Sequence, residues 1–279
     1  MLYVLNYADG EPYESFRKIN SWTAKHIGKA DRIIEYKKDD IDQNFVDANS
    51  AIFAYKRGAG LWLWKPYLIH KALLSINDGD WLMYLDSGTT VINDIHKIVS
   101  FTEQQGQEIF LMEQPLLSRQ FTKRECYVKM GIEDNGENQV LGLLLLRKSR
   151  ASLEFVKEWL EICEDEELLS PNKFYKNIKE FEDFYEHRED QSLLNLLRIK
   201  YKMPVYRDCS DYGEMPYMYA CSKYKYNPHI YESCNYPTTI LCNRKVHPLI
   251  YLMKYYMKRL LRGLGFYYTE GKELKKRLK

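Results

Sequence analysis

The fold is decided by residues 57–88, which read RGAGLWLWKPYLIHKALLSINDGDWLMYLDSG. Pro66 suits the first turn of a helix, and the apolar residues after it recur on one face, at Ile69, Ala72, Leu73 and Ile76. Residues 77–79 are turn formers that end this helix. Residues 81–86 then predict a short strand, apolar enough to be central in a sheet, with Asp86 at its carboxyl end.

The first residues of the chain show a similar alternation. Residues 2–7 are β-rich and apolar, Pro12 opens a helical pattern that stops at Gly28, and residues 30–36 read as a second strand. Further strands are expected at 108–112 and 139–147, and helices at 152–163, capped by Ser152, and at 188–201. We therefore expect an α/β protein with a mostly parallel central sheet flanked by helices.

The C-terminal third differs from this pattern. Residues 203–247 are rich in Tyr, Pro and Cys without a period and predict a covering lobe, whereas residues 249–268 alternate apolar and basic side chains at helical spacing. From 244 to 279 there are eleven Lys or Arg and two Glu, a charge of +9, so residues 1–243 carry −7. An acidic body with a basic tail indicates an anionic membrane surface as a partner, and argues against nucleic acid.

Composition is that of a soluble globular protein, with 45% hydrophobic and 29% charged residues. The sequence shows no basic leader with an apolar core and no apolar run of about 18 residues, so we expect a cytoplasmic protein. The six cysteines form no CxxC pair, which predicts reduced thiols.

Asp86 is the first candidate for chemistry. A buried strand that delivers a carboxylate into the turn Ser87-Gly88 could bind a divalent cation, because Mg²⁺ and Mn²⁺ prefer hard oxygen ligands. The carboxyl edge of an open α/β sheet is also where ligands bind. The alternative is an aspartate that only stabilises its turn.

The second candidate is the sequence Glu189-Asp190-Gln191, at the start of a predicted helix. Acids there complement the helix dipole, which alone could explain them. Together they would also suit hydrogen bonding to a sugar, or proton abstraction from a hydroxyl.

Basic and aromatic residues make a third group, of Arg57, Trp62, Trp64 and Lys65. Tryptophan rings can stack on a base or sugar while the cations meet phosphate, although core packing is the alternative for at least one ring. His187 and His247 lie in polar loops from which an imidazole could reach a metal. Neither GxxxxGK[ST], GxGxxG after the first strand, GxSxG nor HExxH occurs.

The blocks LNYADGEPYESFRKI, RGAGLWLWKPYLIHKAL, DGDWLMYLDSG and HREDQSLLNLL resemble, in order and spacing, bacterial capsular polysaccharide and lipopolysaccharide glycosyltransferases with a GT-A fold. The family form is close to RGYGYWLWKP, then DGD, then YLDAG, and the resemblance covers about residues 1–200. It implies a GT-A domain, which we place at 1–247. The resemblance does not cover the tail, but the basic and apolar side chains at 248–279 predict an amphipathic helix that could dock on a membrane surface.

The resemblance also implies a site. Asp86 matches the acidic position of a degenerate DxD motif that holds Mn²⁺ or Mg²⁺ on the donor diphosphate, and His247 is the best candidate to replace the missing second carboxylate. Asp190 matches the acidic residue that other GT-A enzymes place beside the transferred sugar, and Glu189 next to it is the second catalytic candidate. The residues expected to contact the nucleotide sugar are Arg57, Lys65, Trp64, Tyr7, Asp86, Ser87 and Gln191.

The expected function is therefore metal-assisted transfer of a hexose, from a UDP-sugar, to a glycan or lipid-linked saccharide in surface polysaccharide synthesis. The residues alone do not separate retention from inversion of configuration. The similarity of the DQ pair at 190–191 to that of glycogenin-like and galactosyl enzymes favours retention. Two other interpretations remain: a degenerate domain that binds nucleotide sugar or glycan without turnover, and a peripheral membrane scaffold.

Overall fold

A computed structural model describes residues 1–215, 219, 224–243 and 246–264. Its main sheet has the strand order β2-β1-β3-β6-β5-β7, and of these strands only β6 runs against the others. The strands are β1 (Leu2–Tyr7), β2 (Arg32–Tyr36), β3 (Trp81–Tyr84), β5 (Ile109–Leu117), β6 (Asn138–Arg147) and β7 (Tyr206–Arg207). The expected α/β class with a mostly parallel sheet is confirmed.

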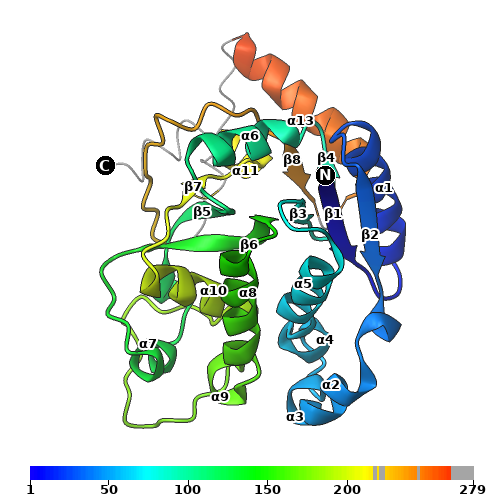
Figure 1. Cartoon of the computed structure of the whole chain (residues 1–279). Coiled ribbons are helices and arrows are strands. Elements are labelled where there is room, and N and C mark those ends of the chain that lie inside the picture. Colours follow the sequence, from blue (N-terminus) through cyan, green and yellow to red (C-terminus); the bar gives the residue numbers. More distant parts are fainter. Residues whose placement is uncertain (216–218, 220–223, 244–245, 265–279) are drawn as a thin grey trace.

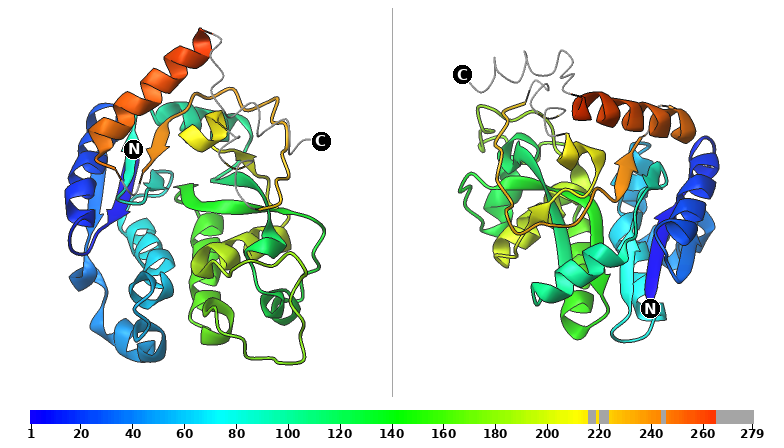
Figure 2. Two further views of the ribbon diagram at one scale, coloured as in Figure 1. Left: turned by 180° about the vertical axis from the view of Figure 1, so that it is seen from behind. Right: turned by 90° about the horizontal axis from the view of Figure 1, so that it is seen from above.

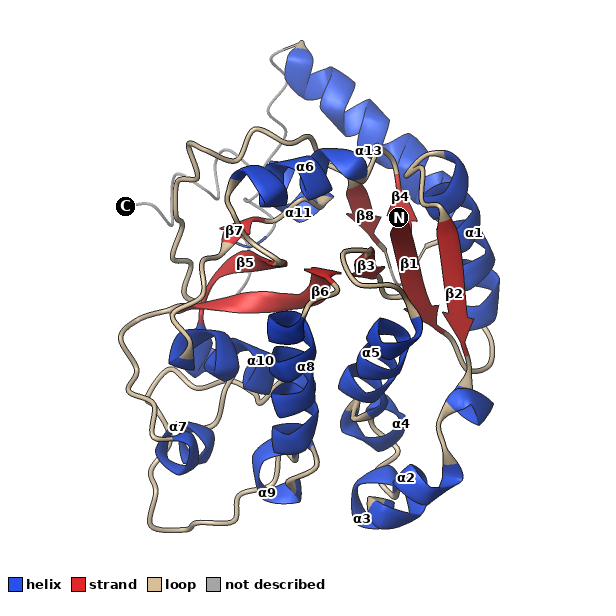
Figure 3. Ribbon diagram, viewed as in Figure 1, coloured by secondary structure: helices blue, strands red, loops and turns tan. Residues whose placement is uncertain are grey.

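Helices lie on both sides of this sheet (Figure 1). They are α1 (Tyr13–His26), α2 (Gln43–Ala48), α3 (Ser50–Phe53), α4 (Gly58–Leu61), α5 (Trp64–Ser75), α6 (His96–Gln104), α7 (Arg124–Met130), α8 (Arg150–Cys163), α9 (Glu166–Leu169), α10 (Glu189–Lys200), α11 (Asp211–Glu214) and α13 (Pro248–Gly263), with 3₁₀ turns η1 (Lys38–Asp40) and η2 (Ser118–Gln120). In Figure 3, α5, α8 and α10 gather below the sheet, and α6 and α13 lie above it.

The core explains this arrangement. All four residues of β3 are buried, as expected for a strand with neighbours on both edges and helices on both faces. Helices α5 and α8 pack on each other, and α10 packs on both α8 and β6. Apolar side chains from the sheet and these helices form one continuous core, in which Trp159 of α8 is fully buried.

A second, two-stranded sheet pairs β4 (Thr89–Val91) with β8 (Ile240–Cys242) in antiparallel register. Strand β4 begins three residues after Asp86, so the turn that carries Asp86 is held between two sheets. Part of the region 203–247 thus forms regular structure, in β7, α11 and β8, of which β8 pairs with the strand that follows the Asp86 turn.

The expected start of one helix, α8, was wrong. The cap of α8 is Ser149, which accepts a hydrogen bond from the Ser152 amide, so the helix begins before the expected cap. Helix α5 begins at Trp64, so Pro66 lies in its first turn, as expected. Helix α13 ends at Gly263, and the last residues of the predicted basic tail, 265–279, lie outside the described residues.

Helix α13 lies across the outside of the molecule beside α1 (Figure 2). Buried Tyr255 anchors it on a small apolar cluster with Ile92, Met215 and Leu241. No helix among the described residues combines the length and the apolar character needed to cross a membrane. The described cysteines, Cys126, Cys163, Cys209, Cys234 and Cys242, are free thiols, in agreement with the expectation of reduced cysteines.

Candidate active site

The short segment before α5, which comprises α4 and Trp62, is a left-handed turn. Five consecutive residues, Gly58 to Trp62, have φ angles of +59°, +50°, +93°, +55° and +60°. Only glycine adopts this region without cost, and each L-residue there loses about 1–2 kcal/mol. Ala59, Leu61 and Trp62 therefore hold a strained backbone, which persists only where the surrounding packing fixes it.

Packing around the indole of Trp64 fixes this turn. The Trp64 Nε1 donates to the Gly58 carbonyl at 2.9 Å, and the ring stacks on Tyr7, at the carboxyl end of β1, with centroids 4.0 Å apart. Trp64 is buried, whereas Trp62 is partly exposed and lies 5.7 Å from the Arg57 guanidinium. The turn thus places Arg57 and a tryptophan face together at the protein surface.

Replacement of Gly58 by alanine should lower the free energy of unfolding by roughly 2–3 kcal/mol. A Cβ at Gly58 would lie 2.3 Å from the Trp62 ring, in addition to the cost of its positive φ. Gly106→Ala is the matched control, because Gly106 has φ +66° and no atom within 4 Å of an added Cβ. Urea unfolding of both variants measures the difference, and equal losses would show that the Trp62 ring accommodates the methyl group.

Lys65, in the first turn of α5, brings two carboxylates together. Its Nζ lies 3.1 Å from Asp190 Oδ2 and 3.9 Å from Asp86 Oδ1, and its side chain is only 7% exposed. The ammonium also lies 3.2 Å from the position of a Cβ at Gly142 of β6, so there is little room for a larger residue there. The structure therefore joins three of the predicted site residues, from α5, the β3 turn and α10.

Asp190 is the most buried acid of this cluster, with a side chain 5% exposed. Burial raises the pKa of its carboxyl above the ordinary value, Lys65 opposes this, and the nearby Asp86 charge adds to it. The Trp159 indole donates to the Asp190 carbonyl at 3.0 Å and so fixes the start of α10. Asp190 is thus a positioned carboxylate whose charge depends on Lys65.

Asp86 is more open than Asp190, with a side chain 25% exposed, and its Oδ1 accepts a hydrogen bond from the Tyr84 hydroxyl at 3.0 Å. Its turn is held from behind by Asn20 of α1. The Asn20 amide donates to the carbonyls of Asp86, at 3.4 Å, and Thr89, at 3.0 Å. Asn6, buried in β1, in turn donates to Asn20 at 2.9 Å.

Glu189 forms a second acid–base pair with Arg57. The Arg57 Nε lies 2.6 Å from Glu189 Oε1, and the guanidinium is half exposed while the carboxylate is buried. Burial raises the pKa of Glu189 to about 7, against the opposing effect of Arg57. Glu189 also has φ +39°, a strained conformation at the first residue of α10.

The raised pKa of Glu189 predicts a pH-dependent stability. Because the folded protein holds this proton more tightly than the unfolded chain, the contribution of Glu189 is fully present below about pH 4.5 and is lost as the pH rises through about 7. Glu189→Gln should remove this pH dependence. The difference in free energy of unfolding between wild type and variant should therefore fall by about 2–3 kcal/mol between pH 5 and pH 8. Urea titrations at pH 5 and pH 8 measure this change, and parallel curves for the two proteins would contradict the prediction.

The other predicted contact residues are also placed. The Gln191 side-chain amide donates to the Gln114 Oε1 at 3.2 Å and to the Val140 carbonyl, which ties the start of α10 to the sheet. Ser87 is buried in the turn after Asp86. Their proposed contacts with a donor stay predictions.

His247 stays a predicted metal ligand. It is exposed and precedes α13, and the described part of the chain shows no group of three or more His, Cys, Asp or Glu side chains arranged to share a metal. The partly exposed Asp86 carboxylate nevertheless fits the way Mg²⁺ binds, through one or two carboxylates plus substrate phosphates. His187, by contrast, is buried among protein atoms, and burial lowers its pKa to about 3.

Sequence reasoning missed three residues that shape the site. Asn20 and Tyr84 contact the Asp86 turn, and Trp159 holds the Asp190 backbone. Nothing in their sequence context distinguishes them from core residues. The glycines at 58 and 60 were a signal for positive φ, since glycine is the default residue there.

The chain is similar in overall structure to several solved glycosyltransferases, whereas no family model and no curated protein matches it. Mouse xyloside xylosyltransferase 1, apo form, has 11% identity and a TM-score of 0.49, over 88% of this chain and 98% of that one. The galactosyltransferase LgtC, in complex with donor and acceptor sugar analogues, has 14% identity and a TM-score of 0.47, over 87% of each chain. A glycosyltransferase involved in glycosylation of the major capsid of PBCV-1 has 11% identity and a TM-score of 0.45, over 92% of this chain and 98% of that one.

Proposed function

We propose that the protein is a glycosyltransferase that moves a hexose from a UDP-sugar to a glycan or lipid-linked saccharide. The observation that carries this proposal is the meeting of Lys65, Asp86 and Asp190, with ion-pair distances of 3.1 and 3.9 Å, after the carboxyl end of a central strand. The sequence resemblance to surface polysaccharide glycosyltransferases, over the blocks that contain these residues, supports the same conclusion.

The chemistry of the reaction fits these groups. Cleavage of a sugar–diphosphate bond builds positive charge on the anomeric carbon and negative charge on the leaving phosphate. Arg57 is half exposed and can bind that phosphate. Buried Lys65 instead holds Asp86 and Asp190 in place and partly neutralises their negative charge. Asp190, with Glu189 beside it in sequence, is the proposed carboxylate next to the transferred sugar, where it supports retention of configuration.

The proposal includes Mn²⁺ or Mg²⁺ as cofactor, with Asp86 as a protein ligand and His247 as the second. Such an ion would neutralise the diphosphate as it leaves. Tyr84 and Asn20 orient the Asp86 turn for this role. The Tyr84 hydroxyl donates a hydrogen bond to the Asp86 carboxylate, and the Asn20 side-chain amide donates to backbone carbonyls of the turn.

The proposed setting is the cytoplasmic face of a membrane, in capsule or lipopolysaccharide synthesis. Residues 1–247 would be the catalytic domain, and residues 248–279, with their excess of basic side chains, would dock it on anionic lipid. We propose no nucleic-acid partner.

A panel of UDP-, GDP-, CMP- and dTDP-sugars, each with Mn²⁺ or EDTA, tests the proposal by thermal shift and by donor hydrolysis. We expect one nucleotide class to raise the Tm and to be hydrolysed, both in a metal-dependent manner that Asp86→Asn abolishes. Stabilisation that survives EDTA would remove the metal from the proposal and leave Arg57 as the phosphate ligand. Binding without hydrolysis would favour the non-catalytic alternative, and no response to any donor would overturn the function.

A further inference from the structure

Helix α13 exposes its apolar face. Leu249, Met253, Tyr256, Met257, Leu260 and Leu264 are all exposed, and their spacing places them on one stripe of the helix, away from buried Tyr255. A surface helix normally turns its apolar side to the core. Among the described residues this stripe, which we call the α13 stripe, remains uncovered, as membrane-surface and partner-binding helices are.

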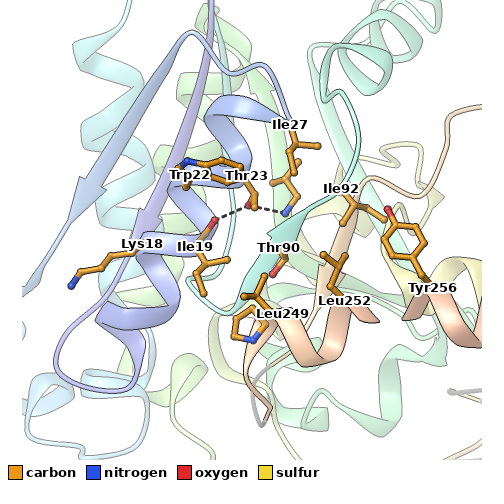
Figure 4. A pocket seen from close by; sticks show the side chains of 12 residues that line it. Lys18, Ile19, Trp22, Thr23, Ile27, Thr90, Ile92, Leu249, Leu252 and Tyr256 are labelled. Carbon is orange, nitrogen blue, oxygen red and sulfur yellow. Dashed lines mark hydrogen bonds between the residues drawn. The ribbon is translucent and has the colours of Figure 1, made fainter. Parts of the chain in front are cut away.

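An apolar groove continues the α13 stripe towards α1 (Figure 4). The groove has a volume of about 410 Å³; its walls are α1 and α13, and its floor is β4. Ile19 and Trp22 line it from α1 and Ile27 from the residue that follows α1, while Leu249, Leu252 and Tyr256 line it from α13. Trp22 at its edge is 58% exposed, a large apolar area for a side chain on a surface helix.

The Thr23 hydroxyl, which lines the groove, already has hydrogen-bond partners. The Thr23 hydroxyl donates to the Ile19 carbonyl at 2.8 Å and accepts from the Val91 amide at 3.1 Å, as Figure 4 shows. The lining therefore offers apolar contact and little that would hold water. Clefts lined mainly by apolar and aromatic side chains are the usual binding sites of apolar ligands.

Positive charges accompany the groove and the α13 stripe. Lys18 lines the groove from α1 and is exposed, and Lys254 and Lys258 are exposed on α13 next to the α13 stripe. Basic side chains that flank an apolar stripe, with an exposed tryptophan at its side, match the anionic headgroups and acyl boundary of a lipid leaflet. An apolar protein partner would not require these lysines.

We propose that the groove between α1 and α13 seats one acyl chain of an anionic phospholipid while the α13 stripe lies in the membrane interface. The lipid headgroup then lies within reach of Lys18, and Trp22 packs beside the chain. This inference deepens the membrane docking proposed above and rests on it, but it does not depend on glycosyl transfer. It differs from docking by α13 alone because it requires residues of α1.

Quenching of Trp22 fluorescence tests the site. The full chain is mixed with phosphatidylcholine vesicles that contain phosphatidylglycerol brominated in mid-chain, and binding is measured separately by sedimentation. Trp64, Trp81 and Trp159 are buried, and Trp62, although partly exposed, does not line the groove. The quenched signal should therefore come mainly from Trp22 and should largely disappear in Trp22→Phe. Ile27→Asn, a change in the groove lining just after α1, should reduce quenching several-fold, while vesicle binding in the sedimentation assay persists through α13.

Val128→Asn is the matched control, since Val128 is exposed on α7, which does not line the groove. The Trp22 fluorescence of this variant should be quenched as strongly as that of the wild type. Equal quenching of Ile27→Asn and wild type would overturn the acyl-chain site, and equal binding to vesicles of phosphatidylcholine alone would overturn the choice of an anionic lipid. Absence of binding to either vesicle would overturn the docking itself. Donor hydrolysis without vesicles reports on the proposed function separately.

Discussion

Lys65→Met should lower the free energy of unfolding by about 3–5 kcal/mol, the usual cost of breaking a buried ion pair from one side. Methionine keeps the length and apolar stem of lysine but removes the ammonium that lies 3.1 Å from Asp190 Oδ2. Asp190 is then left buried beside Asp86, without its compensating charge. The carboxyl must take up a proton at neutral pH or draw water into the core, and either response costs stability.

Chemical denaturation of Lys65→Met and two companion proteins tests this result. Lys71→Met, on the same helix, removes a lysine that pairs with the exposed Asp42, and should remain close to wild type. The double variant Lys65→Met/Asp190→Asn should regain most of the lost stability, because no uncompensated charge remains at 190. Equal stability of the Lys65 and Lys71 variants would show that the buried pair contributes little.

Asp190→Asn should lower kcat for sugar transfer or donor hydrolysis by a factor of about 10²–10⁴, the range for loss of a positioned acid or base. Asparagine fills the same space but cannot carry the charge or accept the proton, so the effect should fall on kcat rather than on KM. The start of α10 should stay in place, because Trp159 binds the backbone carbonyl of residue 190 and not its side chain.

Steady-state kinetics on the preferred donor measures the effect of Asp190→Asn, with circular dichroism to confirm the fold. Asp183→Asn is the control, because Asp183 pairs with Arg119 outside the site and should leave kcat unchanged. A variant at 190 that retains wild-type kcat would remove Asp190 from the reaction. A rise in KM alone would make it a donor-binding residue.

The sequence predicted the strands better than it predicted their directions. Residues 2–7 and 81–84 form β1 and β3 where short apolar runs between turn residues indicated them. Strand β6 was also expected, but an apolar run reads alike in both directions, so its antiparallel insertion between β3 and β5 could not be foreseen. The cap of α8 was misplaced because two serines, at 149 and 152, offer the same chemistry.

In the candidate site, the sequence predicted where Asp86 lies along its strand. It did not predict which residues far apart in the sequence contact each other. Asp86 could be placed at the sheet edge from its strand alone. The contact of Lys65 with Asp190, however, joins residues far apart in the sequence and depends on how α5 and α10 pack. Leu61 and Trp62 adopt left-handed φ angles against their own preferences, because burial of Leu61 and the neighbouring ring contacts outweigh local strain.

The place of β6 has a consequence for how the chain is made. One edge of the apolar strand β3 pairs with β6, and β6 ends about sixty residues after β3 in the sequence. During synthesis this edge of β3 therefore stays unpaired until β6 has been made. At the usual rates of synthesis this interval lasts about 3–12 seconds, during which an unpaired apolar edge is available to other nascent chains. Ribosome-bound fragments that stop before residue 138 should therefore recruit chaperones or aggregate, and those that extend past residue 147 should become protected.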